Sequence, residues 1–328
     1  MLQTRNKTSF ATALVPTLDL ENRGKLTVVV KGTFALGRNQ SLLPIADEQA
    51  PICFAPVFNG EPGRSSVRYE ADTCPSKPNT DVVMVGSARA ARFTTEMDVE
   101  LRVGELHKIV RVFGDRHWTQ RARVWRASAP TPFRVMPLVY ERAFGGDGED
   151  REPRNPVGVG LKRAASDADP DGAALPNLED PRQLIQSRST RPRPAGFGFV
   201  APDWQPRPSF AGTFDAAWQR GRCPLLPADF DARYFQGAAP DLVARGHLSG
   251  GEPVEIRGVS EAGPLVFRIP THRLTVTLSV KGDKQSARPV LDTVLIEPDE
   301  RRVVLSWRVT LPCGGNILYV DWVRIEEA

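Results

Sequence analysis

Apolar and polar residues alternate in short runs near both ends of the chain. Every second residue is apolar from Met97 to Val103, and again from Leu274 to Val280. A period of two places successive side chains on opposite faces of a strand, so each run predicts a strand with one buried face. Runs rich in valine predict two more strands, at 25–34 and 82–85.

Turn residues in the N-terminal part predict how its strands connect. Gly104-Glu105 lies between the run at 97–103 and an apolar-rich run at 106–113, which predicts a hairpin. A third strand is predicted through 121–126. The turns and runs in this part of the chain therefore predict an antiparallel sheet.

The C-terminal part shows the same pattern of short predicted strands separated by turn residues. Its run at 303–309 is expected to pair with the run at 289–296, and further strands are predicted at 254–256 and 317–325. One short helix is predicted at 227–235, because proline suits the first turn of a helix.

Strands at intervals of roughly a dozen residues predict a mainly β protein with little helix, built as an antiparallel sandwich or barrel. The pattern divides the chain into a β-rich part at 1–139, an irregular central segment at 140–242 and a second β-rich part at 243–328. Whether the three parts form one structural unit stays open at this point.

The central segment has an unusual composition. From Phe144 to Leu242 the chain holds 11 Gly and 13 Pro in 99 residues, a share that would suit disorder. However, ten of the chain's 25 aromatic residues also lie there, and large apolar rings favour burial. The composition therefore predicts an ordered but irregular segment, and long ordered loops of this kind usually carry function.

Charge and targeting signals narrow the function classes. The net charge of +4 is small for 328 residues, so it gives little support to nucleic-acid binding. No run of 18 apolar residues and no secretory signal are present, so we expect a cytoplasmic protein without a membrane span.

No local motif predicts a metal site or a cofactor. The four cysteines are far apart in sequence and lack zinc or redox spacing, which favours free thiols in a reducing cytosol while leaving a disulfide open. No phosphate-binding glycine loop and no hydrolase signature occur. We therefore expect neither a metal nor a cofactor.

Three carboxylates in the central segment are the best catalytic candidates. Glu141, Asp203 and Asp215 each lie beside an aromatic residue, and two such carboxylates could hydrolyse a glycosidic bond. The favoured interpretation is structural: the carboxylates cap turns or pair with nearby arginines. Those arginines are Arg142, Arg207 and Arg220.

An arginine-rich stretch carries a second hypothesis. Arg116, Arg121, Arg123 and Arg126 lie close to Trp118 and Trp125, and arginine and tryptophan together can bind single-stranded nucleic acid. At strand spacing some of these side chains must point to opposite faces. A solvated sheet face with buried tryptophans is therefore favoured, and no nucleic-acid partner is expected.

The central phrases resemble a bacterial family catalogued as domain of unknown function (DUF) family 2169. The resemblance extends from about residue 31 to residue 323, with its specific phrases in the middle. Those phrases are Tyr140-Glu141-Arg142-Ala143-Phe144-Gly145-Gly146, Asn155-Pro156-Val157-Gly158, Leu175-Pro176-Asn177, Pro194-Ala195-Gly196-Phe197-Gly198 and Asp203-Trp204, followed by Asp215 and Trp218.

The resemblance implies a role in type VI secretion. Members of this family are typically encoded near VgrG spike proteins and PAAR-like tip proteins, which implies an adaptor or chaperone rather than an enzyme. Its partners would be a PAAR-like protein or a toxic effector, with VgrG a further candidate. Competing hypotheses are a hydrolase and a carbohydrate-binding β-module.

Aromatic and arginine side chains are the types that most often anchor interfaces. Trp204 is predicted to lie on an extended, surface-running loop, because Pro202 and Pro206 flank it. The predicted partner-binding residues are Tyr140, Arg142, Phe144, Phe197, Phe199, Trp204, Arg207 and Trp218.

Overall fold

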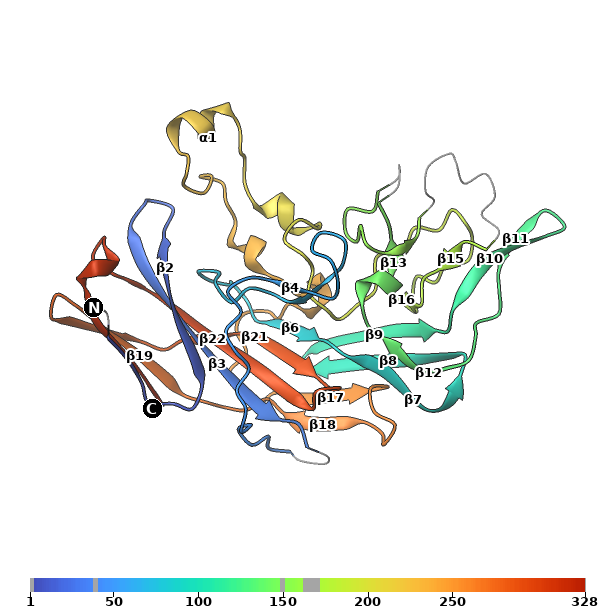
Figure 1. The fold of residues 1–328 in the computed structure, drawn as a ribbon, viewed down its shortest axis with the longest axis horizontal. Coiled ribbons are helices and arrows are strands. Elements are labelled where there is room, and N and C mark those ends of the chain that lie inside the picture. Colours follow the sequence, from blue (N-terminus) through green and yellow to red (C-terminus); the bar gives the residue numbers. More distant parts are fainter. Residues whose placement is uncertain (1–2, 38–40, 148–150, 162–171, 328) are drawn as a thin grey trace.

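The computed structural model describes residues 3–37, 41–147, 151–161 and 172–327. Strands make up 43% of the chain and helices 7%, so the mainly β prediction is confirmed. The larger sheets are mostly antiparallel, as in a sandwich, and none of them closes on itself within the described ranges (Figure 1).

The first large sheet joins strands from both ends of the chain. All its pairs are antiparallel except the last, in which β6 runs parallel to β21. Its strands in spatial order are β2 (Ala11–Leu18), β3 (Gly24–Ala35), β22 (Arg302–Pro312), β21 (Val290–Glu297) and β6 (Asp81–Met84).

The second large sheet also mixes N-terminal and C-terminal strands, and it is antiparallel throughout. Its spatial order is β16 (Leu178–Glu179), β9 (Leu106–Phe113), β8 (Glu96–Val103), β17 (Pro253–Arg257) and β18 (Leu265–Arg268). Both large sheets therefore depend on segments that lie more than a hundred residues apart.

Smaller elements complete the fold. A four-stranded sheet has the order β1 (Gln3–Asn6), β23 (Val320–Glu327), β19 (Leu274–Val280) and β20 (Asp283–Ala287). The remaining paired strands are β10 (Arg116–Arg121), β11 (Val124–Ala127) and β15 (Ala174–Leu175), then β7 (Ser87–Thr94) with β12 (Phe133–Pro137), β13 (Phe144–Gly145) with β14 (Val159–Gly160), and β4 (Val57–Phe58) with β5 (Val67–Tyr69).

Helix is scarce in the described residues. The α-helix α1 covers Ala216–Gly221, and 3₁₀ turns cover η1 (Tyr140–Arg142), η2 (Arg207–Phe210), η3 (Ala232–Phe235), η4 (Pro240–Leu242) and η5 (Ile317–Tyr319). No helix there combines the length and the apolar character needed to cross a membrane.

Most of the predicted strands are confirmed. The hairpin at Gly104-Glu105 joins β8 to β9, and the predicted pairing of 289–296 with 303–309 is that of β21 with β22. The last predicted strand begins only at Val320, after the turn η5. Period two thus identified β8 in the second large sheet and β19 in the four-stranded sheet, and the valine-rich runs identified β3 and β6 in the first large sheet.

Two local predictions are wrong. The strand predicted through 121–126 is a hairpin turn, because Ala122 and Arg123 adopt positive φ angles of 49° and 63° between β10 and β11. The helix predicted at 227–235 contains only η3. The α-helix forms earlier instead, where the Asp215 side chain accepts a hydrogen bond from the Trp218 N–H and caps α1.

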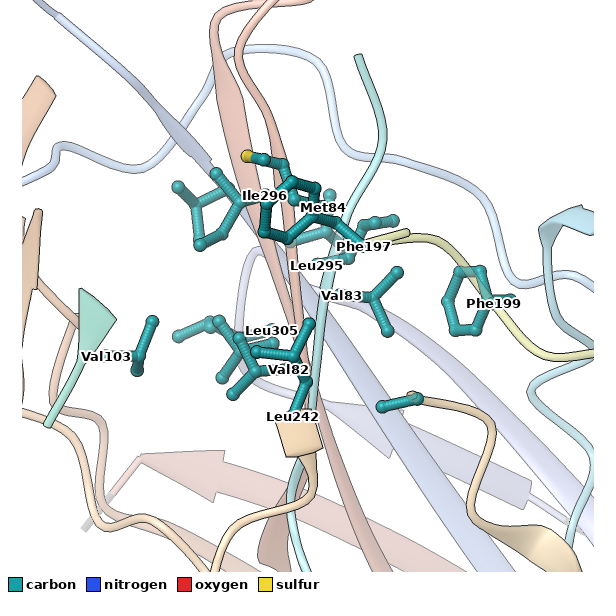
Figure 2. Close-up of a cluster of buried hydrophobic side chains, with 14 of the residues drawn as sticks. Val82, Val83, Met84, Val103, Phe197, Phe199, Leu242, Leu295, Ile296 and Leu305 are labelled. Carbon is teal, nitrogen blue, oxygen red and sulfur yellow. The ribbon is translucent and has the colours of Figure 1, made fainter. Parts of the chain in front are cut away.

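The central segment supplies part of the hydrophobic core. Figure 2 shows Phe197 and Phe199 among the side chains of β6 and β21, and both rings are buried. The Met84 N–H donates to the Phe197 carbonyl oxygen at 2.9 Å, so the segment also covers the edge of the first sheet. The stretch that carries Phe197 and Phe199 is therefore held in place by rings that are buried in the core.

Candidate binding groove

A groove with a volume of about 790 Å³ lies where the central segment meets β9. We call it the β9 groove. Its apolar lining is formed by Ile109, Tyr140, Pro194, Ala195, Val200, Pro206, Ala239 and Pro240. Its polar and charged lining is formed by Lys108, Arg154, Asp180, Arg182, Gln183, Arg193, Gln205 and Asp241.

Tyr140 lies at the centre of the packing behind this groove. Its ring meets the Trp204 ring edge to face, with centroids 5.7 Å apart. A Cβ atom on Gly196 would lie 2.8 Å from the Tyr140 Cε1 atom, which is closer than real side chains approach. Tyr140 therefore requires glycine at 196, and this contact joins the phrase at 140–146 to the phrase at 194–198.

Buried charges hold the same segment from the other side. Arg207 is 4% exposed and forms an ion pair with Glu70 at 2.6 Å, and Glu70 also lies 3.3 Å from the Lys77 ammonium. Lys77 in turn pairs with Asp81 at 2.8 Å. Burial opposes the charge on Lys77, but the carboxylates of Asp81 and Glu70 outweigh burial and raise its pKa.

Hydrogen bonds extend this ion network into the groove wall. Arg207 donates to the carbonyl oxygens of Val200 and Tyr234, both at 2.8 Å. The Asp81 carboxylate accepts from Gln236 Nε2 at 2.6 Å and from the Gly237 N–H at 2.8 Å. Since a buried charge is costly unless it is paired, the network fixes the backbone on both sides of the groove.

The charged rim is mostly paired internally. The Arg154 side chain binds Glu152 through two hydrogen bonds of 2.6 and 2.7 Å. Burial favours the protonated form of Glu152, but side-chain and backbone hydrogen bonds from Arg154 outweigh burial and lower its pKa. Arg182 makes a similar two-bond pair with Asp180.

Two further cations complete the rim. The Lys108 ammonium lies 2.8 Å from Asp241, and burial lowers the pKa of Lys108 although Asp241 opposes that shift. The Arg193 guanidinium is exposed and has no carboxylate partner among the described residues. The groove therefore combines an apolar floor with an excess of positive charge at its rim.

A family model described as an uncharacterized protein conserved in bacteria (DUF2169) matches residues 21–308. The chain belongs to this family. No curated protein and no solved structure matches the chain. Of the phrases that carry the resemblance, those at 140–146 and 194–198 contribute residues directly to the β9 groove of this DUF2169 chain, and Gln205-Pro206 follows the phrase at 203–204.

The structure places most of the predicted partner-binding side chains in the interior of this DUF2169 chain. Trp204 is only 3% exposed, so the prediction that it lies on a surface-running loop is wrong. Successive turns place it inside: its N–H donates to the Ala201 carbonyl, and its own carbonyl accepts from the Arg207 N–H. The buried members of the predicted set are Tyr140, Phe144, Phe197, Phe199, Trp204 and Arg207.

The other two predicted side chains reach the surface. Arg142 donates to Asn177 Oδ1 at 3.0 Å and pairs with Asp115 at 3.3 Å. Trp218 lies on α1, where its indole N–H donates to the Leu225 carbonyl at 2.8 Å and its ring packs against Phe214. Neither Arg142 nor Trp218 lines the β9 groove.

The three candidate carboxylates are not brought together in any one cavity of the described residues. Glu141 accepts hydrogen bonds of 2.7 Å from both the N–H and the hydroxyl of Ser66, and Asp215 caps α1. Asp203 is exposed beside another hollow. Asp215 thus caps a helix turn, as the structural interpretation predicted, whereas Glu141 binds Ser66 instead of capping a turn or pairing with an arginine. Arg207, one of the expected arginine partners, binds Glu70.

The arginine-rich stretch is divided by burial. Arg116 is buried and pairs with Glu179, and Trp118 is buried nearby, whereas Arg121, Arg123 and Arg126 are exposed on the β10–β11 hairpin. All four cysteines are unpaired, in agreement with the favoured prediction. Within the described ranges, no three His, Cys, Asp or Glu side chains are grouped to hold a metal ion.

Sequence reasoning did not find the rim of the groove. Lys108, Arg154, Arg182 and Arg193 come from separate segments, and no motif joins them. One available signal was Pro181, which lies two residues after the short strand β16 and cannot donate a backbone hydrogen bond to β9.

Proposed function

We propose that this chain is an adaptor of bacterial type VI secretion, which binds a PAAR-like tip protein or its toxic effector in the cytosol and helps to mount it on the VgrG spike. The family membership and the implied genomic setting motivate this role. The structural observation that supports protein binding is the β9 groove, whose lining includes Tyr140, Pro194 and Ala195 from two of the phrases that carry the resemblance. An apolar floor within a polar, arginine-rich rim is the usual anatomy of a protein interface.

Rigidity is the second property that suits an adaptor. Arg207, which pairs with Glu70, holds the Val200 carbonyl oxygen, and Asp81, which pairs with Lys77, holds the N–H of Gly237, two residues before Ala239. A preorganised surface loses little conformational entropy on binding, so it can hold a client without folding around it.

Co-expression tests this proposal. The chain would be expressed with each PAAR-like protein and effector encoded beside its gene, and complexes would be purified through a tag on the partner. The proposal predicts co-purification with at least one of them, and none with a tagged PAAR-like protein from an unrelated locus. A folded chain that co-purifies with none of its neighbours would contradict the adaptor role.

One observation keeps the hydrolase as a second candidate. A hollow of about 630 Å³ is lined by two carboxylates, Asp147 and Asp203, together with Arg64 and Arg151. Two carboxylates in one cavity are the minimum for acid–base hydrolysis of a glycosidic bond. Under the adaptor proposal, Asp203→Asn leaves client binding and secretion unchanged. Hydrolytic turnover that is present in the wild type and lost in a folded Asp203→Asn variant would favour the enzyme instead.

A further inference from the structure

The outer edge of β9 is only partly covered. On that side β16 pairs with two residues of β9, Leu178 with Val112 and Glu179 with Arg111. The same register would place Pro181 beside Ile109, but proline has no N–H to donate. The chain turns away there, since the Gln183 N–H donates to the Asp180 carbonyl. The edge at 106–110 therefore has no strand neighbour among the described residues.

The hairpin geometry shows which backbone groups this edge offers. Val103 and Leu106 face each other across the two-residue turn at Gly104-Glu105, so they form the hydrogen-bonded pair that closes the hairpin. Alternate residues of β9 consequently direct N–H and C=O away from β8, beginning with His107 and Ile109. The Phe113 N–H, which donates to the Asn177 carbonyl on the β16 side, has the same parity.

The open edge coincides with the β9 groove. Lys108 and Ile109 line the groove together with Asp180 and Arg182, which lie where the chain leaves β16. In Figure 1, β9 lies next to β16 at the upper edge of the second sheet. Unpaired backbone groups beside an apolar groove are the arrangement by which proteins bind an extended peptide as an added strand.

The charge of the rim indicates what such a peptide carries. Arg193 has no carboxylate partner in the described part of the chain and can turn toward a ligand. Arg182 is paired with Asp180, but its side chain is 82% exposed, so a ligand carboxylate can reach it. Arginine binds carboxylates through two parallel hydrogen bonds, which makes an acidic side chain the complementary group.

We propose that the β9 groove binds an extended segment of a client protein as an additional strand, which pairs with His107 and Ile109 and continues the ladder begun by β16. Alternate apolar side chains of that segment face Tyr140, Val200 and Pro240, and an Asp or Glu beside them binds Arg182 and Arg193. The inference rests on the proposed adaptor function for the identity of the client, but the binding mode can be tested without it.

The first test is selection from a library of short random peptides displayed on phage, with the full chain as bait. Selected peptides should share alternating apolar residues and at least one carboxylate. Their affinity, measured by fluorescence anisotropy, should fall at least about tenfold in the Arg182→Glu/Arg193→Glu variant. Arg191→Glu is the matched control, because Arg191 is exposed in the same segment but does not line the groove. It should change the affinity less than about twofold.

The second test needs no change in the protein. N-methylation removes a backbone donor from the peptide, and in a strand added at an edge only every second N–H faces that edge. Methylation at one parity should abolish binding, and methylation of the intervening nitrogens should preserve it. Equal effects at both parities would overturn strand addition.

The remaining outcomes also decide the question. Failure to select any peptide, or peptides that bind the double variant as well as the wild type, would overturn the proposal. A dimer that dissociates in the double variant would assign the edge to a second copy of this chain instead. If peptides bind as described but no neighbouring protein co-purifies, the adaptor function fails while the binding mode stands.

Discussion

Two stretches of the central segment have similar compositions but differ in burial. Residues 194–207 and 212–230 each contain three aromatic residues, two glycines and at least two prolines. In the first stretch all three rings are buried, whereas in the second Phe214 is 55% exposed and Trp218 is only partly covered. Figure 1 shows the second stretch as an arm that carries α1 away from the sheets.

The difference lies in where each stretch finds its hydrogen-bond partners. The first binds distant residues, with the Phe197 carbonyl on β6 and Arg207 on Glu70. The arm is held mainly by itself, through the Asp215 cap and the bond from the Trp218 indole to Leu225. Composition therefore predicts order, but burial depends on partners that are remote in sequence.

The two tryptophans are expected to differ most in how much their replacement destabilises the chain. Trp204→Ala should lower the free energy of unfolding by about 3–5 kcal/mol, because it removes a buried ring that packs on Tyr140. Trp218→Ala should cost only about 1 kcal/mol, mainly for the lost hydrogen bond to Leu225. Urea denaturation of both variants measures this difference in the free energy of unfolding, and equal losses of stability would contradict the prediction.

Breaking the buried ion network should have the next largest effect. Lys77→Met leaves the Asp81 carboxylate, which is fully buried, without its closest cation, and should cost about 3 kcal/mol. The corresponding polar change in the arm, Asp215→Ala, removes only a helix cap and should cost about 1 kcal/mol. Thermal unfolding of the two variants compares them, and a smaller loss for Lys77→Met than for Asp215→Ala would contradict the role given to the network.

A glycine pair tests the packing around Tyr140. Gly196→Ala should destabilise the chain by about 1–3 kcal/mol, because its new methyl group would overlap the Tyr140 ring. Gly198→Ala is the matched control, since its Cβ would lie 3.8 Å from the same ring, an ordinary contact. Equal denaturation midpoints for the two variants would show that the ring can move aside, and the close fit would then be absent.

The smallest expected effect concerns pH. Because the folded pKa of Glu152 is below its unfolded value, Glu152 stabilises the fold when ionised. That contribution is present above about pH 4.3, the ordinary pKa of glutamate, and is lost as the pH falls through the lower folded value. The stability difference between the wild type and Glu152→Gln, followed by urea denaturation, should therefore shrink as the medium is acidified. If this stability difference grew on acidification, the pKa of Glu152 would be raised in the folded state rather than lowered.

The sequence predicted those features of the fold that depend on residues close together in the chain. Alternation predicted β8, because one face of that strand is buried, and the turn residues Gly104-Glu105 predicted the hairpin to β9. The turn at Ala122-Arg123 was missed because residues other than glycine adopt its positive φ angles. The burial of Trp204 was missed because its flanking prolines occur in a run of tight turns rather than in an extended loop. No local signal could join Lys77 to Arg207, which lie 130 positions apart.

Hydrogen–deuterium exchange of the chain, alone and in complex with its co-purified client, tests directly whether the β9 groove is the binding site. In the complex, we expect slower amide exchange at 106–110, 180–194 and 239–241, which surround the β9 groove, and unchanged exchange in the arm at 212–230. Protection confined to the arm, with the groove segments unchanged, would contradict the claim that the groove is the binding site.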